Sequence, residues 1–468
     1  MSTRKENFLN YLRENANQYL NGPTESWLQD VLEGNFNSLP KNPFDMDWQV
    51  FALLINGYQL SRKLGLGETL EFVKYCLKRY RISGELPQKS IELWVCLFGI
   101  QREEHFTGYP IELDEECAQF LIEIFSRLRT NLSSEDGVIK LCNSFHTTPE
   151  KRYKNELIYR YWMYQNKHFT PAHEYFDQVN NDFRRPPVFL PEKMQHNILT
   201  QPESTVQYNK RLFNLIPMGE HHYRYNSMNS SQALALSVLG NLFLENQLSI
   251  LHRLHDDEGE SLILNQPIRY DTLSFEHKVD YLGERRNTSI DAFIPGKSQI
   301  AIECKFTEKE VGSCSRPRMA KSNPKYEQLH CEGSYIRRKD HEERCVLAES
   351  GIKYWEFIPF FFNWDVHRDE EKCKIRFTYQ LVRNILAAGC GKDLTPSPRS
   401  GQVILIYDSR NPECQHGGKI YKSYCETKEA LLNPKMLKKI SWQSIVRQMR
   451  LENILPWLTL QLREKYGF

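Results

Sequence analysis

The sequence lacks the long uncharged apolar run that a transmembrane helix needs. No segment of its 468 residues approaches the roughly 18 consecutive apolar residues of such a helix. The N-terminal stretch, MSTRKENFLNYLREN, also lacks the apolar core of a secretion signal. These two absences predict a cytoplasmic protein whose thiols stay reduced.

A strong net charge is absent as well, since 61 Lys and Arg residues stand against 59 Asp and Glu residues. Residues 1–150 hold 15 basic and 21 acidic residues, a net of −6, so the remainder holds 46 against 38, a net of +8. Because phosphate neutralisation dominates affinity for nucleic acids, we expect the DNA surface in the basic remainder. A solvated basic loop would look the same, but residues 316–325 contain no acid and four candidate DNA contacts: Arg316, Arg318, Lys321 and Lys325.

The 12 cysteines contain no Cys-x-x-Cys pair, the spacing that usually supplies half of a zinc or iron–sulfur site. Four of them nevertheless fall within residues 307–377. Two interpretations stay open, a site for Zn²⁺ or an iron–sulfur cluster and a set of ordinary buried thiols. The four residues are Cys314, Cys331, Cys345 and Cys373.

What the sequence does contain is a pair of apolar runs with ionisable residues inside them, TSIDAFIPGKSQIAIECKF at 288–306. The PGKS segment has good turn chemistry, so the two runs are predicted to be neighbouring strands. Side chains alternate along a strand, which places Glu303 and Lys305 on one face and Cys304 on the other. In such a pair of strands Asp291 would lie beside Glu303.

Two carboxylates and an amine are what metal-dependent phosphodiester hydrolysis needs. Mg²⁺ takes few protein ligands and keeps several waters, so Asp291 and Glu303 suffice to hold it. The ion polarises the phosphate and lowers the pKa of a bound water. Lys305 should stay charged beside two carboxylates, which favours electrostatic stabilisation over a general-base role. The alternative is two half-buried strands with a stabilising Glu–Lys pair.

An acidic residue followed by Glu-x-Lys resembles the PD-(D/E)XK nuclease superfamily, the fold of many restriction endonucleases. The resemblance implies that Asp291, Glu303 and Lys305 occupy the catalytic positions and that the metal ion is Mg²⁺ or Mn²⁺. The chain departs from the pattern at Ile290, which stands where the name-giving proline would be.

The parts of that superfamily's α-β-β-β-α-β core are expected in order around the motif. A run that begins at Ser230 has helical apolar spacing and a serine at its N-cap, and the helix TYQLVRNILAAG is predicted to end at Gly389 as its C-cap. The combination of SSQAL and YQLVRN resembles one bacterial branch of restriction-endonuclease-like proteins over about residues 220–410. The expected strands are 262–269, 278–282, 288–294, 299–306 and 402–410.

Helix residues supply candidate auxiliary groups. Gln380 and Arg383 lie three apart on one helix face, so both could reach the site or a phosphate. A helix glutamine near the catalytic lysine recurs in the PD-(D/E)XK superfamily, so the resemblance implies a catalytic role for Gln380, and we assign Arg383 to DNA binding. Gln232 and Glu245 are weaker candidates, because a Gln after a Ser-Ser cap also suits an ordinary helix start.

The predicted fold class is a restriction-endonuclease-like α/β core, with a mixed central sheet flanked by helices, and an all-helical N-terminal domain. In the core, the aromatic run YWEFIPFFFNW is interpreted as a buried strand. The stretch RRPPVFLPEK is interpreted as an extended linker that crosses the surface. The expected parts are a helical domain at 1–150, a connecting segment at 151–225, a nuclease domain at 226–425 and C-terminal helices at 426–468.

These features predict a Mg²⁺-dependent endonuclease, a hydrolase of phosphodiester bonds, that acts on DNA. Analogy with the similar proteins adds a role in bacterial defence or restriction. The alternative is a catalytically inactive nuclease-fold subunit that binds DNA or regulates another protein. Buried charges are costly to keep, which favours the enzyme. The acidic N-terminal domain is expected to bind a protein partner or a second copy of the chain.

Overall fold

The computed structural model describes residues 149–177, 185–264, 269–284, 288–339, 341–390 and 392–468. Residues 1–148, nearly all of the predicted helical N-terminal domain, lie outside this part of the chain. The chain divides into two compact units, residues 1–167 with 183–185 and residues 168–182 with 186–468. The sheet and the candidate site belong to the second unit.

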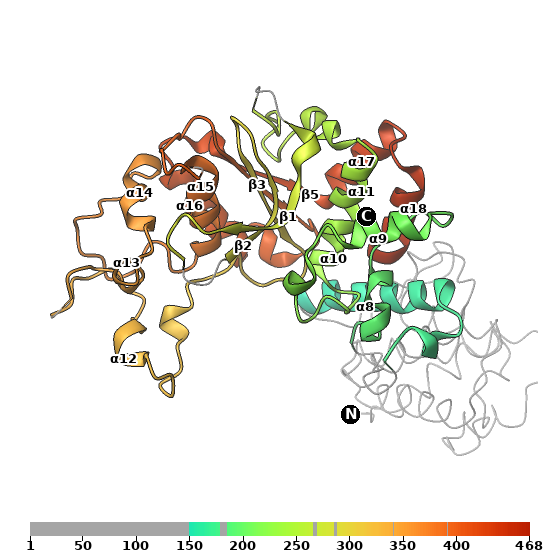
Figure 1. Ribbon diagram of the computed structural model, residues 1–468, viewed down its shortest axis with the longest axis horizontal. Helices are drawn as coiled ribbons and strands as arrows, with labels where there is room; N and C mark the ends of the chain where they lie inside the picture. Colours follow the sequence, from blue (N-terminus) through green and yellow to red (C-terminus); the bar gives the residue numbers. More distant parts are fainter. Residues whose placement is uncertain (1–148, 178–184, 265–268, 285–287, 340, 391) are drawn as a thin grey trace, which may run out of the picture. The chain divides into compact units, whose positions relative to one another are not determined.

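A mixed sheet of five strands forms the centre of this unit (Figure 1). The strands follow chain order across the sheet: β1, β2 and β3 are antiparallel neighbours, and β3, β4 and β5 are parallel. The connections between the parallel strands contain helices, as parallel pairing requires. This sheet with flanking helices agrees with the predicted α/β core. The strands are β1 Ser274–Val279, β2 Thr288–Ile294, β3 Ile300–Lys305, β4 Gln402–Tyr407 and β5 Leu437–Ser441.

The two strands of the motif confirm the sequence prediction. β2 spans the predicted residues, and β3 begins one residue later than expected. β1 begins four residues before the predicted strand 278–282. The chain leaves the sheet after Val279, and the carbonyl of Leu282 accepts a hydrogen bond from the amide of Lys353 in place of a strand partner (3.0 Å).

The first predicted strand, 262–269, is not confirmed. Residues 262–264 form no strand, and residues 265–268 lie outside the described residues. The side chain of Gln402 accepts a hydrogen bond from the Leu264 amide at 3.3 Å. A side chain therefore satisfies an amide that the prediction gave to a strand ladder.

The edge strand β5 lies within residues 426–468, where the sequence predicts C-terminal helices and no strand. Its sequence, LKKIS, carries two lysines and so lacks the apolar run that identified the other strands. Lys438 is nevertheless 2% exposed. Its amine pairs with Asp256 at 2.7 Å, so an ion pair replaces the expected apolar contact.

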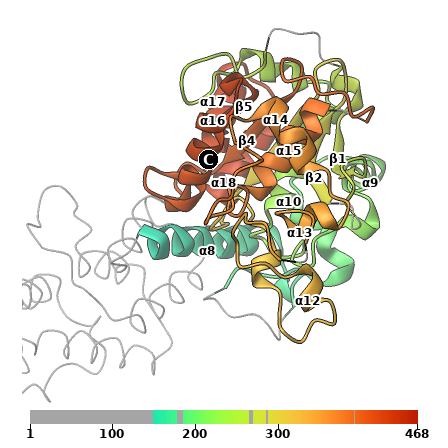
Figure 2. The ribbon, with the colours of Figure 1, turned by 90° about the vertical axis from the view of Figure 1, so that its left-hand side faces the viewer.

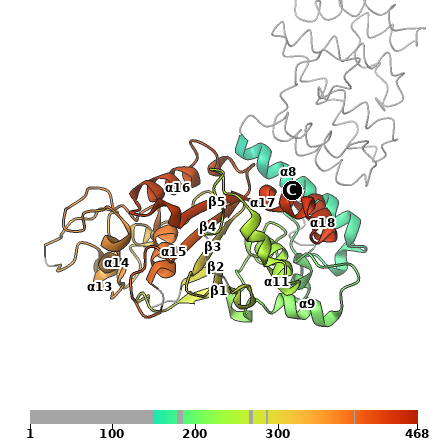
Figure 3. The same ribbon diagram turned by 90° about the horizontal axis from the view of Figure 1, so that it is seen from above.

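Helix α15, Tyr379–Cys390, covers one face of the sheet at β3 and β4 (Figure 3). The predicted helix is confirmed, but it continues through Gly389 instead of ending there. A Cβ atom at Gly389 would lie 2.2 Å from the ring of Phe361. Glycine at this position therefore allows close packing by the neighbouring helix and is not a cap.

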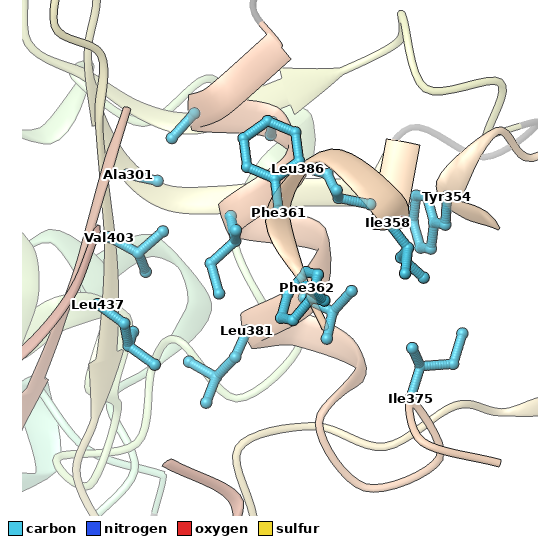
Figure 4. Packing of buried hydrophobic residues seen from close by; sticks show 14 of the residues in the cluster. Ala301, Tyr354, Ile358, Phe361, Phe362, Ile375, Leu381, Leu386, Val403 and Leu437 are labelled. Atoms are coloured by element: carbon cyan, nitrogen blue, oxygen red, sulfur yellow. The ribbon is translucent and has the colours of Figure 1, made fainter. Parts of the chain in front are cut away.

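That neighbour is α14, Tyr354–Phe361, which corrects the interpretation of its aromatic run as a strand. The apolar residues recur at helical spacing, so that Tyr354, Phe357, Ile358 and Phe361 are buried while Phe360 is 52% exposed. Figure 4 shows Ala301, Val403 and Leu437, from three adjacent strands, facing the side chains of α14 and α15. These helices and the sheet share one apolar core.

The helix that begins the core contacts β3 from the other face (Figure 3). It runs as α10, Ser231–Ala235, then one π-helical turn, Leu236–Gly240, then α11, Asn241–Leu244. The predicted N-cap is confirmed, because the hydroxyl of Ser230 accepts a hydrogen bond from the amide of Ala233 at 3.2 Å.

The segment between β3 and α15, which we call the insertion (residues 307–377), has little regular structure. Apart from α14, its α-helices have four residues each, α12 Tyr326–Leu329 and α13 Val346–Glu349. In Figures 1 and 2, α13 and then α12 lie below α14 and α15. An isolated bridge between Tyr335 and Glu370 joins its two halves.

The predicted surface linker RRPPVFLPEK packs more tightly than expected. Phe189 is fully buried, with its ring centroid 4.3 Å from that of Phe176. Backbone bridges tie this stretch to Phe176 and to Ser227, so it is part of the second unit's framework. Residues 191–197 continue as a 3₁₀ helix.

The other α-helices of the described residues precede or follow the core along the chain. No helix in the described part of the chain is long and apolar enough to cross a membrane. These helices are α8 Pro149–His168, α9 Val206–Phe213, α16 Lys419–Ala430, α17 Trp442–Leu451 and α18 Pro456–Tyr466.

Candidate active site

The pairing of β2 with β3 brings together the two carboxylates of the motif. Ala292 pairs with Ile302, so Asp291 and Glu303 are the residues that come next on β2 and β3 beyond the last pair. One carboxylate oxygen of Asp291 accepts a hydrogen bond from the backbone amide of Cys304 at 2.7 Å. The predicted juxtaposition of Asp291 and Glu303 is therefore present.

Lys305 lies on the same face of β3 as Glu303. Its amine is 2.8 Å from a Glu303 oxygen, and the two residues are 7% and 1% exposed. The amine also donates a hydrogen bond to the side-chain oxygen of Gln380 on α15 at 3.0 Å. Three of the four predicted catalytic residues thus form one connected set, with Asp291 on the adjacent strand.

Helix α15 fixes the second oxygen of Glu303. The amide of Asn384, a residue that sequence reasoning missed, donates to that oxygen at 2.7 Å. Arg383 is 3% exposed and donates to the carbonyl of Ser289 at 2.8 Å and to Asn384. The structure therefore places Arg383 behind the site, 4.0 Å from Glu303, and not at a surface where phosphate binds.

A third carboxylate, Glu276 on β1, was missed by sequence reasoning. The β1–β2 register sets it opposite Asp291, and its backbone φ is +47°, a left-handed value that is costly outside glycine. Its oxygens accept hydrogen bonds from Ser289 and, at 2.6 Å, from Gln232. Glu276 fell outside the predicted strand, so only a correct β1 boundary would have revealed it.

The two weaker candidates on the first core helix, Gln232 and Glu245, have different surroundings in the structure. Gln232 donates to Glu276, and its side-chain oxygen accepts the amide of His222 at 3.0 Å, so it links a surface loop to the site. Glu245 is exposed and interacts with Tyr208 instead. The structure therefore brings Gln232, but not Glu245, to the carboxylates.

Burial and mutual repulsion govern the ionisation of these groups. Burial, followed by the Glu303 carboxylate, raises the pKa of Asp291 well above its usual value. Burial also raises the pKa of Glu276, although hydrogen bonds from Ser289 and Gln232 oppose the shift. Burial alone would lower the pKa of Lys305, but the carboxylates of Glu303, Glu308 and Asp291 outweigh it and raise that pKa. Lys305 is thus a fixed positive charge.

The oxygen-only donor set suits a hard cation. No group of three or more His, Cys, Asp or Glu side chains among the described residues is arranged to hold a metal ion. Mg²⁺ needs fewer than three protein ligands, since it is usually held by one or two carboxylates together with waters and substrate phosphate. Asp291 and Glu303 provide such a pair, and a bound cation would oppose the raised pKa of Asp291.

The predicted basic contacts lie on the insertion just after the site. Arg318, Lys321 and Lys325 are exposed, whereas Arg316 is partly buried. Arg318 pairs with Glu310 at 3.3 Å. The loop begins beside the site, because the carbonyl of Gly312 accepts the backbone amide of Gln380 at 3.3 Å.

Gly312 controls the position of Gln380, and Gly312→Ala tests this. A Cβ atom there would lie 2.0 Å from the Gln380 side-chain oxygen, and the φ of +115° disfavours any other residue. We expect displacement of Gln380, a loss of about 1–3 kcal/mol of stability and roughly 10²-fold slower turnover of the reaction that the site catalyses. Gly259→Ala is the matched control, because Gly259 has a φ of +80° and nothing within 4 Å of its Cβ position. Equal effects of both variants on that turnover would contradict this role of Gly312.

Comparison with known proteins adds one match. A family model described as Restriction Endonuclease associating with ARP matches residues 153–467. No curated protein and no solved structure matches the chain.

Proposed function

Since this chain belongs to the family described as restriction endonucleases associating with ARP, we propose that it is a metal-dependent endonuclease that hydrolyses phosphodiester bonds of DNA. The observation that carries the proposal is the connected set of Asp291, Glu303 and Lys305. A buried amine lies 2.8 Å from one carboxylate, and the second carboxylate lies on the neighbouring strand. Buried charges of this kind are costly unless they are used.

In the proposed mechanism, the carboxylates of Asp291 and Glu303 would hold Mg²⁺ or Mn²⁺. The ion, when bound, polarises the scissile phosphate and supplies a water of lowered pKa as nucleophile. Glu303 is kept in place by Lys305 on one oxygen and by Asn384 on the other, so its orientation is set before substrate binds.

Lys305 stabilises the charge that develops on the phosphate. Glu303 and Gln380 occupy two of its three N–H donors, so the third can donate to the attacking water or to a phosphate oxygen. Because nearby carboxylates raise its pKa, Lys305 stays protonated and cannot serve as the base. Gln380 positions the amine.

Glu276 gives the site a third carboxylate, which interacts electrostatically with Asp291 and Glu303. Its pKa responds to Glu303, and that of Asp291 responds to Glu276. We assign to Glu276 a supporting role in binding the metal ion, and Gln232 and Ser289 would hold its carboxylate in orientation. The strained backbone at this position supports a functional role.

The DNA backbone is proposed to run along the insertion. Arg318, Lys321 and Lys325 are exposed there and can each neutralise a phosphate. Gly312 joins this segment to Gln380, so a strand bound by the basic residues would pass the site. A role in restriction or defence within the cytoplasm is part of the same proposal.

The family description also names an association with ARP, which supports a protein partner. We place that contact on the acidic residues 1–150, where direct binding to DNA is electrostatically unfavourable. A second copy of the chain is the other candidate partner.

The proposal is tested by incubating purified protein with plasmid DNA, single-stranded DNA and RNA, in Mg²⁺ and in EDTA. We expect cleavage of DNA in Mg²⁺ and none in EDTA. Absence of metal-dependent products from all three substrates, with the family's partner protein present or absent, would favour the alternative of an inactive DNA-binding subunit.

A further inference from the structure

A short loop of aromatic and basic side chains, residues 221–224, precedes the first core helix, and we call it the aromatic loop. Its sequence is HHYR, and it follows a 3₁₀ turn, Met218–Glu220. The side chains of His222, Tyr223 and Arg224 are exposed, and Tyr223 is 76% exposed. The proposed mechanism uses none of these three residues.

The ends of the aromatic loop are fastened to the body of the protein. The ring of His221 stacks on Phe213 of α9, with the centroids 4.7 Å apart, and meets the edge of the buried Tyr225 ring at 4.5 Å. The amide of Tyr225 donates a hydrogen bond to the carbonyl of His222 at 2.8 Å. The loop therefore has a fixed shape before any ligand binds, which lowers the entropy cost of binding.

Gln232 joins the aromatic loop to a carboxylate of the candidate site. Its side-chain oxygen accepts the amide of His222 at 3.0 Å. Its side-chain nitrogen donates to the carboxylate of Glu276 at 2.6 Å and to the carbonyl of Glu220 at 3.0 Å. The carboxylate of Glu220 pairs with Lys278 on β1 at 2.7 Å. These contacts place the loop at the border of the site on the side of β1.

A second set of contacts ties the chain near the loop to the end of β3. The side-chain amide of Asn229 donates to the hydroxyl of Thr307, the first residue of the insertion, at 2.6 Å. The carboxylate of the next residue, Glu308, acts electrostatically on both His222 and Lys305. The loop and the start of the insertion therefore both border the site.

The three exposed side chains suit a nucleotide. The guanidinium of Arg224 lies over the Tyr223 ring, 5.1 Å from its centroid, and the His222 ring is 4.5 Å from it. Burial and the charge of Arg224 lower the pKa of His222, so at neutral pH the charge of this group belongs to Arg224. An aromatic ring beside an arginine is a common platform for a base and its phosphate.

We propose that the aromatic loop holds an unpaired nucleotide of the DNA strand next to the site, with Tyr223 stacked on the base and Arg224 bound to a phosphate. The inference rests on the proposed function and deepens it, because it names single-stranded DNA as the form of the substrate. A base inside a duplex is already stacked on both faces, so only an unpaired base offers a face to the ring. Gln232 would keep that nucleotide beside the carboxylates.

The experiment measures binding of the full-length protein to a labelled single-stranded oligonucleotide and to its duplex, in EDTA so that binding is separated from cleavage. Tyr223→Ala should weaken binding to the single strand by about 10-fold and to the duplex by less than about 2-fold. Tyr223→Phe keeps the face of the ring and should restore the affinity. Phe360→Ala is the matched control, because Phe360 is an aromatic residue on α14 that is 52% exposed.

The control should bind both DNAs as wild type does. Wild type that does not bind the single strand would overturn the proposal. So would wild-type affinity in Tyr223→Ala, an equal loss on both DNAs, or an equal loss in Tyr223→Phe.

Arg224→Gln tests the phosphate contact separately. Loss of one contact should weaken binding to the single strand and reduce the slope of log Kd against log salt concentration by about 0.7. Tyr223→Ala should leave that slope unchanged, because stacking on a base releases no counterions from phosphate. A wild-type slope in Arg224→Gln would contradict the role assigned to Arg224.

These binding results are distinguishable from a failure of the proposed function. If binding depends on Tyr223 but wild type cuts no DNA in Mg²⁺, the loop contacts DNA and the nuclease proposal is wrong. If wild type cuts DNA in Mg²⁺ and Tyr223→Ala binds the single strand as well as wild type does, the nuclease proposal stands and the role of the loop is wrong.

Discussion

Asp291→Asn should remove DNA cleavage by about 10³-fold or more without weakening the metal-free fold. Asn keeps the size of the side chain and its oxygen can still accept the amide of Cys304, so the local geometry survives. The substitution removes one of the two anionic ligands proposed for Mg²⁺. Activity, and not folding, therefore depends on the charge of Asp291.

The stability of the same variant should depend on pH in a defined direction. The folded-state pKa of Asp291 is raised, by burial first and by Glu303 second, above the usual 3.8. Between those two values the folded protein binds more protons than the unfolded chain, so the contribution of Asp291 to stability falls as pH rises. Without metal, the free energy of unfolding of Asp291→Asn should therefore increase relative to that of wild type by on the order of 1 kcal/mol as pH rises from acid to neutral.

Thermal unfolding in EDTA across this pH range measures the effect, and added Mg²⁺ should then stabilise wild type more than the variant. Asp280→Asn is the control, because Asp280 is an exposed carboxylate just beyond β1. A variant that is less stable than wild type at neutral pH would show that Asp291 serves the fold.

Lys305→Met should remove cleavage by roughly 10²–10³-fold and also destabilise the protein strongly. Methionine preserves much of the length of the side chain but leaves Glu303, 1% exposed, without its amine partner. Breaking one side of a buried ion pair typically costs about 3–5 kcal/mol, because the remaining charge is uncompensated. Chemical denaturation of the metal-free protein measures this loss.

The double variant Glu303→Gln with Lys305→Met separates catalysis from folding. The neutral Gln can still accept the hydrogen bond from Asn384, so most of the lost stability should return. Cleavage should remain absent, because the double variant lacks both the amine of Lys305 and the Glu303 carboxylate that is proposed to bind the metal. If the double variant is no more stable than Lys305→Met, the unpaired charge is not the cause of the destabilisation.

The centre of the site could be predicted from the sequence because its information is local. Alternation along two strands and a turn between them placed Asp291, Glu303 and Lys305 together, and each of these relationships spans few residues. The position of Gln380 near the lysine was predicted from the resemblance to the PD-(D/E)XK superfamily. The geometry confirms these placements, while the chemical roles remain proposals.

What was missed depends on long-range packing. Glu276 reaches the site only through the β1–β2 register and a left-handed backbone, neither of which has a local signal. The burial of Arg383 follows from the depth of α15 against the sheet, which helical spacing does not give. The edge strand β5 was not predicted because its buried Lys438 forms an ion pair with Asp256, a residue distant in the sequence.

The most direct test of the central claim is the cleavage rate of one DNA substrate by wild type, Asp291→Asn and Asp280→Asn. Each protein is assayed in Mg²⁺ and in EDTA. The proposed site predicts Mg²⁺-dependent cleavage by wild type and Asp280→Asn, and none by Asp291→Asn. Cleavage that persists in Asp291→Asn, or that continues in EDTA, would contradict it.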